Sequence, residues 1–140
     1  MTKYVSLLKN SGLKSTFQRI HMLENIASCG HMSIDDIYEK VVKIHPSLSL
    51  ATVYKNIILM VEKGVLTEVP ITGKKSKYEL SKEDHIHLIC IACGKVEDKP
   101  HNLHINTICT SMSKEENFVL NKQQINLYGK CITCHATPNV

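Results

Sequence analysis

The chain has 140 residues, 43% of them hydrophobic, which is enough for one ordinary domain or two small ones. No apolar run approaches the roughly 18 residues of a membrane span, and the first ten residues lack the apolar stretch of a signal peptide. We therefore expect a cytoplasmic protein without a membrane partner. The net charge of +4 lies entirely in residues 1–80, which hold eleven Lys or Arg against seven Asp or Glu, whereas residues 81–140 hold six of each. Such an excess suits a polyanion-binding surface, although ordinary solubility also explains a charge of this size.

The first 80 residues predict helices followed by a hairpin. Apolar residues recur every three or four positions in three segments, each preceded by a Ser or Thr that can cap a helix: Thr16 before 17–28, Ser33 before 34–43 and Ser49 before 50–63. Two strands, 65–71 and 77–80, then flank a turn at Gly73-Lys74-Lys75. Short helices followed by a hairpin with a basic tip indicate a winged helix-turn-helix domain over residues 1–80.

From residue 81 the pattern changes. The polar segment 81–84 is the expected hinge, and residues 85–140 form a second small domain. Strand character at 85–90 and 118–128 and a helical pattern at 103–112 predict a mixed architecture for this domain. The expected fold class is α+β, with an N-terminal winged helix-turn-helix domain followed by a small α/β domain.

Two matched Cys-x-x-Cys pairs are the most specific local pattern: Cys90 with Cys93, and Cys131 with Cys134. If each pair forms a hairpin tip, both of its sulfurs can reach one ion. Four thiolates about 2.3 Å from Zn²⁺ form a closed tetrahedral shell without a position for substrate, so the pattern predicts a structural zinc that contributes folding free energy. A redox dithiol pair and two unrelated buried pairs are the alternatives. Cys29 and Cys109 have no partner at a useful spacing.

Five segments together resemble the ferric uptake regulator family over essentially the whole chain: 13–19 (LKSTFQR), 35–38 (DDIY), 49–54 (SLATVY), 85–94 (HIHLICIACG) and 127–131 (LYGKC). The resemblance implies a repressor, not an enzyme, that acts as a homodimer of winged-helix DNA-binding domains on zinc-stabilised α/β dimerisation domains. The chain departs from many relatives at Phe17, where they have proline. A further metal site of some relatives needs polar ligands where this chain has Ile86 and Gln123, so we expect that site to be absent.

The resemblance also implies a regulatory metal site at the hinge, with ligands from both domains: His31, Glu79, His85, His87 and Asp98. The chemistry of these residues agrees with this. His85 and His87 are two apart on a strand and so point the same way. Imidazole and carboxylate together suit Fe²⁺, Mn²⁺, Zn²⁺ or Ni²⁺ and not Ca²⁺. Bound Fe²⁺ or Mn²⁺ would fix the relative angle of the domains and so couple metal binding to DNA affinity. His101 and His104 match no implied position and are expected on the surface, with competition by one of them for a ligand position near Asp98 as the alternative.

Two branches of the family remain open. In the peroxide-sensing branch, iron-driven oxidation of ligand histidines releases DNA, and His31 and His85 match the oxidised positions. Both cysteine pairs and the missing extra site favour this branch, so our first interpretation is a repressor that responds to oxidative stress. Glu79, where a peroxide sensor typically has Asp, favours an iron-responsive repressor that controls iron homeostasis. A zinc or nickel sensor is the third interpretation.

The helix from Leu50 is expected to enter the major groove of double-stranded DNA. Its early polar residues face the bases, and basic or polar residues elsewhere contact phosphates: Thr52, Tyr54, Lys55 and Asn56 for the first group, and Lys14, Thr16, Gln18, Arg19, Lys74, Lys75 and Lys77 for the second. The alternative for Tyr54 is a half-buried position. The two-fold symmetry of a dimer predicts an operator that is an inverted repeat, and the family resemblance implies that it is A/T-rich.

Other classes of protein remain as alternatives. One is a redox enzyme that uses the dithiols, or a metalloenzyme that uses His85 and His87. Closed thiolate shells are inert, however, and no general base or nucleophile is recognisable beside the histidines. Another is a zinc-storage or structural nucleic-acid-binding protein without a metal-dependent switch.

Overall fold

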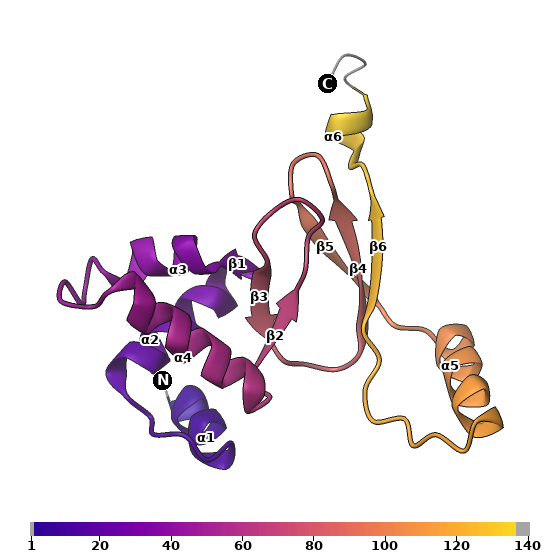
Figure 1. Cartoon of the computed structure of the whole chain (residues 1–140), viewed down its shortest axis with the longest axis horizontal. Coiled ribbons are helices and arrows are strands. Elements are labelled where there is room, and N and C mark those ends of the chain that lie inside the picture. Colours follow the sequence, from indigo (N-terminus) through magenta and orange to yellow (C-terminus); the bar gives the residue numbers. More distant parts are fainter. Residues whose placement is uncertain (1, 137–140) are drawn as a thin grey trace. The chain divides into compact units, whose positions relative to one another are not determined.

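The computed structural model describes residues 2–136, and the chain divides into two compact units between Ser81 and Lys82 (Figure 1). The elements of the first unit are α1 (Thr2–Asn10), α2 (Phe17–Cys29), β1 (Met32–Ser33), α3 (Ile34–Val41), α4 (Leu50–Glu62), β2 (Leu66–Val69) and β3 (Lys77–Leu80). Those of the second unit are β4 (His85–Cys90), β5 (Val96–Pro100), α5 (Leu103–Glu115), β6 (Ile125–Gly129) and α6 (Ile132–His135). Within residues 2–136, each helix is too short or too polar to cross a membrane.

The three predicted helix starts in the first unit are confirmed by their caps. The side chains of Thr16, Ser33 and Ser49 each accept a hydrogen bond from the backbone N–H three residues later. Each cap therefore satisfies one N–H group that the first helical turn leaves without an intrahelical partner. Helix α1 was not predicted; its Leu8 is fully buried and joins it to the core.

Helix α4 has one buried face and one exposed face. Val53, Ile57 and Met60 are fully buried in the core of the first unit, at the spacing of successive helical turns. The opposite side exposes Tyr54 and Lys55. Helix α4 is thus held by its apolar stripe while its polar face stays accessible.

The sheet of the first unit has the order β1-β3-β2, and all of its pairs are antiparallel. Strands β2 and β3 form the predicted hairpin, in which Thr67 pairs with Glu79. At its tip, Lys74 N–H donates to the carbonyl oxygen of Ile71, 3.0 Å away. Helices followed by this hairpin make the winged helix-turn-helix arrangement expected from the sequence.

The sheet of the second unit has the order β5-β4-β6, with β4 antiparallel to β5 and parallel to β6. The predicted strand at 118–128 is wrong in its first part, because β6 begins only at Ile125. Phe118 and Val119, which suggested strand character, are 64% and 79% exposed and lie outside the sheet. Strand β5 was not predicted because its charged sequence shows no apolar alternation.

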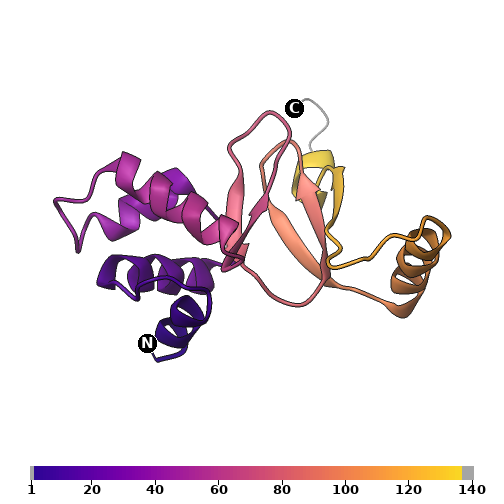
Figure 2. The same cartoon turned by 60° about the horizontal axis from the view of Figure 1, so that its bottom comes forward.

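Helix α5 is amphipathic but has no buried residue. In both orientations it stands away from the sheet of its own unit, joined to it by extended segments (Figures 1 and 2). Leu103, Ile108 and Met112 are 77%, 59% and 58% exposed. A single copy of the chain therefore leaves the apolar side chains of this helix uncovered.

Candidate metal centres and nucleic-acid interface

The four cysteines of the two Cys-x-x-Cys pairs come together at one end of the β4–β6 pair. Their sulfur atoms all lie within 4.8 Å of one another, and Cys93 Sγ is 3.7 Å from Cys131 Sγ. Sulfurs at the corners of a tetrahedron, each about 2.3 Å from a zinc ion, are about 3.8 Å apart. The spacing of these side chains thus fits a tetrahedral thiolate site.

Different backbone structures present the two cysteine pairs. Cys90 ends β4, and the turn after it closes through the N–H of Gly94, which donates to Cys90 O at 2.8 Å. Gly94 has φ +81°, which glycine adopts without strain. Cys131 instead precedes the short helix α6, which contains Cys134. The expectation of a second hairpin tip is wrong, because a helical turn brings these two sulfurs to the same side.

Hydrogen bonds distribute the protons unevenly over the cluster. Backbone N–H groups of Cys131 and Cys93 point at the Cys90 sulfur and lower the pKa of that thiol to about 5. Hydrogen bonds with the sulfurs of Cys131 and Cys90 raise the pKa of Cys134 to about 12. The lowered pKa of Cys90 favours the thiolate, the form of cysteine that binds metal.

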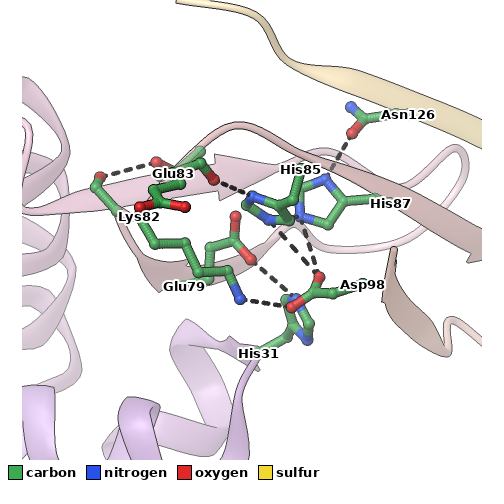
Figure 3. Close-up of polar contacts among 10 residues, drawn as sticks. His31, Glu79, Lys82, Glu83, His85, His87, Asp98 and Asn126 are labelled. Atoms are coloured by element: carbon green, nitrogen blue, oxygen red, sulfur yellow. Dashed lines mark hydrogen bonds and ion pairs between the residues drawn. The ribbon is translucent and has the colours of Figure 1, made fainter. Parts of the chain in front are cut away.

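In the second unit, His85 and His87 lie on the same face of β4 and Asp98 lies beside them on β5 (Figure 3). The two Nε2 atoms are 2.8 Å apart, and Asp98 Oδ1 is 3.7 Å from that of His85 and 3.5 Å from that of His87. The other oxygen of Asp98 accepts from Lys82 Nζ at 2.6 Å. Lys82 thus restrains the carboxylate that faces both imidazoles.

The contacts of the two Nδ1 atoms determine which nitrogen of each imidazole carries the hydrogen. His85 Nδ1 is 2.9 Å from the carbonyl oxygen of Glu83, which can only accept, so this nitrogen carries the hydrogen. His87 Nδ1 is 2.8 Å from Asn126 Oδ1, also an acceptor. With the hydrogen of each ring on Nδ1, the two Nε2 atoms face each other and a carboxylate oxygen. Three electron-pair donors at this separation repel unless a cation or a proton lies among them, so the donor set fits a metal ion.

In the first unit, His31 and Glu79 form a pair of their own. His31 Nε2 is 2.9 Å from Glu79 Oε2, and their side chains are 12% and 2% exposed. Glu79 is buried on β3, while His31 directly precedes β1, the neighbouring strand. The sheet therefore holds one imidazole and one carboxylate of the expected regulatory set side by side.

The polar face of α4 and the hairpin form a candidate nucleic-acid surface. Thr52, Tyr54 and Lys55 are exposed and Asn56 is half-buried. Tyr54 is 53% exposed, so the half-buried alternative for this residue is wrong. Of the expected phosphate contacts, Lys14, Gln18, Lys74 and Lys75 are exposed, whereas Thr16, Arg19 and Lys77 are half-buried.

Two of these residues have contacts within the protein that the sequence did not show. Arg19 Nε donates to Asn56 Oδ1 at 2.9 Å, and Arg19 Nη1 donates to the carbonyl oxygen of Lys14 at 3.0 Å. Lys75 forms an ion pair with Asp35 at the start of α3. Arg19 therefore links the start of α2 to the polar face of α4.

Comparisons with known proteins match this chain to one family over nearly its full length. Residues 10–128 match the model of the ferric uptake regulator family. A ferric uptake regulation protein of Yersinia pestis is 35% identical over 136 residues, which cover 95% of this chain and 91% of that protein. The solved ferric uptake regulator of Vibrio cholerae is similar with a TM-score of 0.75 and 32% identity, covering 91% of this chain and 98% of that one. The peroxide stress regulator of Campylobacter jejuni is similar with a TM-score of 0.77, also at 32% identity, covering 93% and 98%.

A winged helix-turn-helix unit followed by a unit with clustered cysteines and histidines defines the class of metal-responsive DNA-binding regulators. The family match spans most of the chain and the relatives exceed 30% identity, so the chain belongs to the ferric uptake regulator family. Members of this family are transcription regulators that bind DNA as dimers, and they are not enzymes. The expected family, fold class and non-enzymatic character are therefore confirmed.

Sequence reasoning missed Asn126 and Lys82, whose side chains contact His87 and Asp98. Neither residue belongs to a recognisable motif, and strand pairing brings Asn126 to the site. Of the two histidines expected on the surface, His104 is exposed and His101 is half-buried.

The link between Arg19 and Asn56 predicts energetic coupling between these side chains. Arg19→Ala and Asn56→Ala should each lower the free energy of unfolding, and the double variant should lose about 1 kcal/mol less than the sum, because the same hydrogen bond is removed twice. Urea unfolding followed by circular dichroism measures this. Gln18→Ala, an exposed neighbour, serves as the control and should add independently to Asn56→Ala. Additive losses for Arg19 and Asn56 would contradict the link.

Proposed function

We propose that this chain is a metal-dependent, DNA-binding transcriptional repressor that senses peroxide through a regulatory site for Fe²⁺ or Mn²⁺. One observation carries the proposal: His85 Nε2, His87 Nε2 and one oxygen of Asp98 lie within 3.7 Å of one another. Residues 1–80 are the DNA-binding domain, 81–84 the hinge and 85–140 the dimerisation domain. Because the proposed partner is double-stranded DNA, we expect the repressor in the cytoplasm.

A structural zinc held by Cys90, Cys93, Cys131 and Cys134 is the first part of the proposal. The sulfur spacing supports it, as does the Cys90 thiolate. Held by four thiolates, the ion has no open position, and its role is to fasten the end of β4 to the segment after β6. The redox alternative is less favourable because a closed thiolate shell is inert.

The regulatory site takes ligands from both domains in this proposal: His31 and Glu79 from the first, and His85, His87 and Asp98 from the second. Within each unit these residues already lie together. The second unit presents Nε2 lone pairs and a carboxylate oxygen, and the first adds an imidazole and a buried carboxylate. Fe²⁺ and Mn²⁺ accept such mixed nitrogen and oxygen ligands. Joining both sets favours one arrangement of the domains, which is the arrangement that binds DNA.

The exposure of the ligand histidines supports a peroxide response. His31 and His85, at the positions that the family resemblance associates with oxidation, have side chains 12% and 15% exposed, whereas that of His87 is 1% exposed. Bound Fe²⁺ would supply the electron transfer that activates peroxide. The accessible imidazoles would then take up the oxygen atom, while buried His87 would be spared.

A second candidate function is an iron-responsive repressor that controls iron homeostasis, favoured by Glu79. Its longer side chain stands where a peroxide sensor typically has Asp. The similarity to solved structures does not separate the two, because the iron and peroxide regulators are both 32% identical to this chain.

We also propose that the repressor is a homodimer and that its operator is an inverted repeat. Among the described residues of the second unit, the buried hydrophobic side chains, Ile86, Ile89 and Cys90, all lie on β4. The exposed large apolar residues of this unit form the surface that a second copy would cover: Ile91, Leu103, Ile108, Met112, Phe118, Val119, Leu127, Tyr128 and Ile132. Paired copies place two α4 helices in successive major grooves, with Tyr54 and Lys55 near the bases.

The zinc assignment predicts a loss of metal and of structure together. Cys93→Ser should abolish the tight binding of about one zinc per chain and render the second unit sensitive to protease, because zinc binding contributes folding free energy. Elemental analysis and limited proteolysis measure both effects. Cys29→Ser is the control, since Cys29 is exposed and lies outside the cluster. A zinc content in Cys93→Ser equal to that of the wild type would contradict the assignment.

The regulatory function is tested by metal titration of DNA binding. An operator selected from random duplexes should bind the zinc-loaded protein tightly only when Mn²⁺ or Fe²⁺ is added, and His85→Ala should abolish this dependence. His104→Ala, exposed and outside the set, is the control. Peroxide should release the DNA from the Fe²⁺ form and add the mass of one oxygen atom to His31 or His85 in mass spectrometry.

The outcomes separate the candidate functions. Binding that needs Fe²⁺ but survives peroxide without a mass change indicates the iron-responsive repressor. Binding that ignores both added metal and chelators would contradict a metal-dependent switch of either kind.

The placement of α4 predicts a charge effect at Lys55. Lys55→Ala should weaken operator binding and reduce the slope of log affinity against log salt by about 1, because one fewer positive charge of the protein lies in the groove and displaces a counterion from the DNA. Lys63→Ala, which removes an equal charge at the opposite end of α4, should leave the slope unchanged. Equal slopes for wild type and Lys55→Ala, measured by fluorescence anisotropy, would show that α4 lies elsewhere.

A further inference from the structure

Asn126 lies next to His87 because of the parallel pairing of β4 with β6. The register pairs Ile86 with Ile125 at the start of β6, and the next pair is His87 with Asn126. Both side chains lie on the same face of the sheet, as residues paired across two strands do. In Figure 3, Asn126 is on the opposite side of the His87 ring from Asp98.

The Asn126 amide can determine which nitrogen of His87 carries the hydrogen. Its Oδ1 lies 2.8 Å from His87 Nδ1 and only accepts, so Nδ1 donates and Nε2 keeps its lone pair. At the other end of the amide, Nδ2 donates to the Tyr128 hydroxyl oxygen at 3.5 Å.

We propose that Asn126 is a positioning residue that holds His87 in the Nδ1–H tautomer, with Nε2 directed at the metal. This inference rests on the regulatory site proposed above, but it adds a residue that is not a ligand. The His87 side chain is 1% exposed, so water has little access to replace the amide oxygen. Without an acceptor at Nδ1, the ring can shift its hydrogen to Nε2, which then cannot bind metal.

His85 provides a contrast within the same site. Its Nδ1 faces the backbone carbonyl of Glu83, an acceptor that no side-chain substitution removes. The His85 tautomer should therefore be independent of Asn126, and only His87 depends on a replaceable side chain. The acceptor that orients a metal-binding histidine commonly changes metal affinity by about 10- to 100-fold when it is lost.

The test uses the full zinc-loaded chain and compares Asn126→Leu, which has no acceptor, with Asn126→Asp, which keeps one. Nitrogen NMR of the histidine rings without added Mn²⁺ gives the tautomers. Wild type and Asn126→Asp should show Nδ1–H at His87, whereas Asn126→Leu should shift toward Nε2–H while His85 stays unchanged. Mn²⁺ titration should give about 10- to 100-fold weaker binding for Asn126→Leu and at least wild-type affinity for Asn126→Asp. Circular dichroism and zinc content check folding, and Asn126→Ala replaces the leucine variant if that one does not fold.

The results separate this inference from the proposed function. An unchanged His87 tautomer and unchanged Mn²⁺ affinity in the variants without an acceptor would overturn the role of Asn126. If the wild type binds no Mn²⁺ that is sensitive to His85→Ala, the regulatory site is wrong, and the role of Asn126 at that site falls with it. Mn²⁺ binding by the wild type with a changed tautomer and weaker affinity in Asn126→Leu supports both.

Discussion

The pairing of β4 with a neighbour on each side is the constraint on which both proposed metal centres depend. On one side, the antiparallel register with β5 places Asp98 opposite His87; on the other, the parallel register with β6 places Asn126 there. The same ladder ends with Cys90 opposite Gly129, two residues before Cys131. A shift of one residue in either register would turn alternate side chains to the other face and separate these groups.

The elements that were predicted correctly are those whose signals are local. The capping residues Thr16, Ser33 and Ser49 each precede an apolar stripe with helical spacing, and all three helices begin where expected. Strand β5 carries Glu97, Asp98 and Lys99, so it shows no alternation, and its position follows from pairing with β4. At 118–128, apolar residues suggested one strand, but exposed Phe118 and Val119 do not take part in the sheet.

The candidate sites also differ in whether their sequence signals are local. Spacing alone indicated the four cysteines, because two residues between sulfurs are a local requirement of one ion. The histidines and carboxylates are spread over residues 31–98, and only the family resemblance joined them into one set. Asn126 had no sequence signal at all: an amide on a strand is ordinary until the register shows what lies opposite. Arg19 was expected at a phosphate, but its contact with Asn56 also makes it part of the scaffold that presents α4.

The two proposed metal centres have opposite requirements, and β4 serves both. A structural ion must stay bound, which suits four thiolates, whereas a regulatory ion must exchange, which suits imidazole and carboxylate ligands. A zinc ion that fastens the end of β4 to the segment after β6, as proposed, would keep His87 in register with Asp98 and Asn126 whether or not the proposed regulatory ion is bound. The ligands of the second unit are then ordered in advance, and so are His31 and Glu79 within the first. In the proposed mechanism, little of the binding free energy of the regulatory ion would be needed to order either half, so most of it would go into joining the two domains and changing DNA affinity.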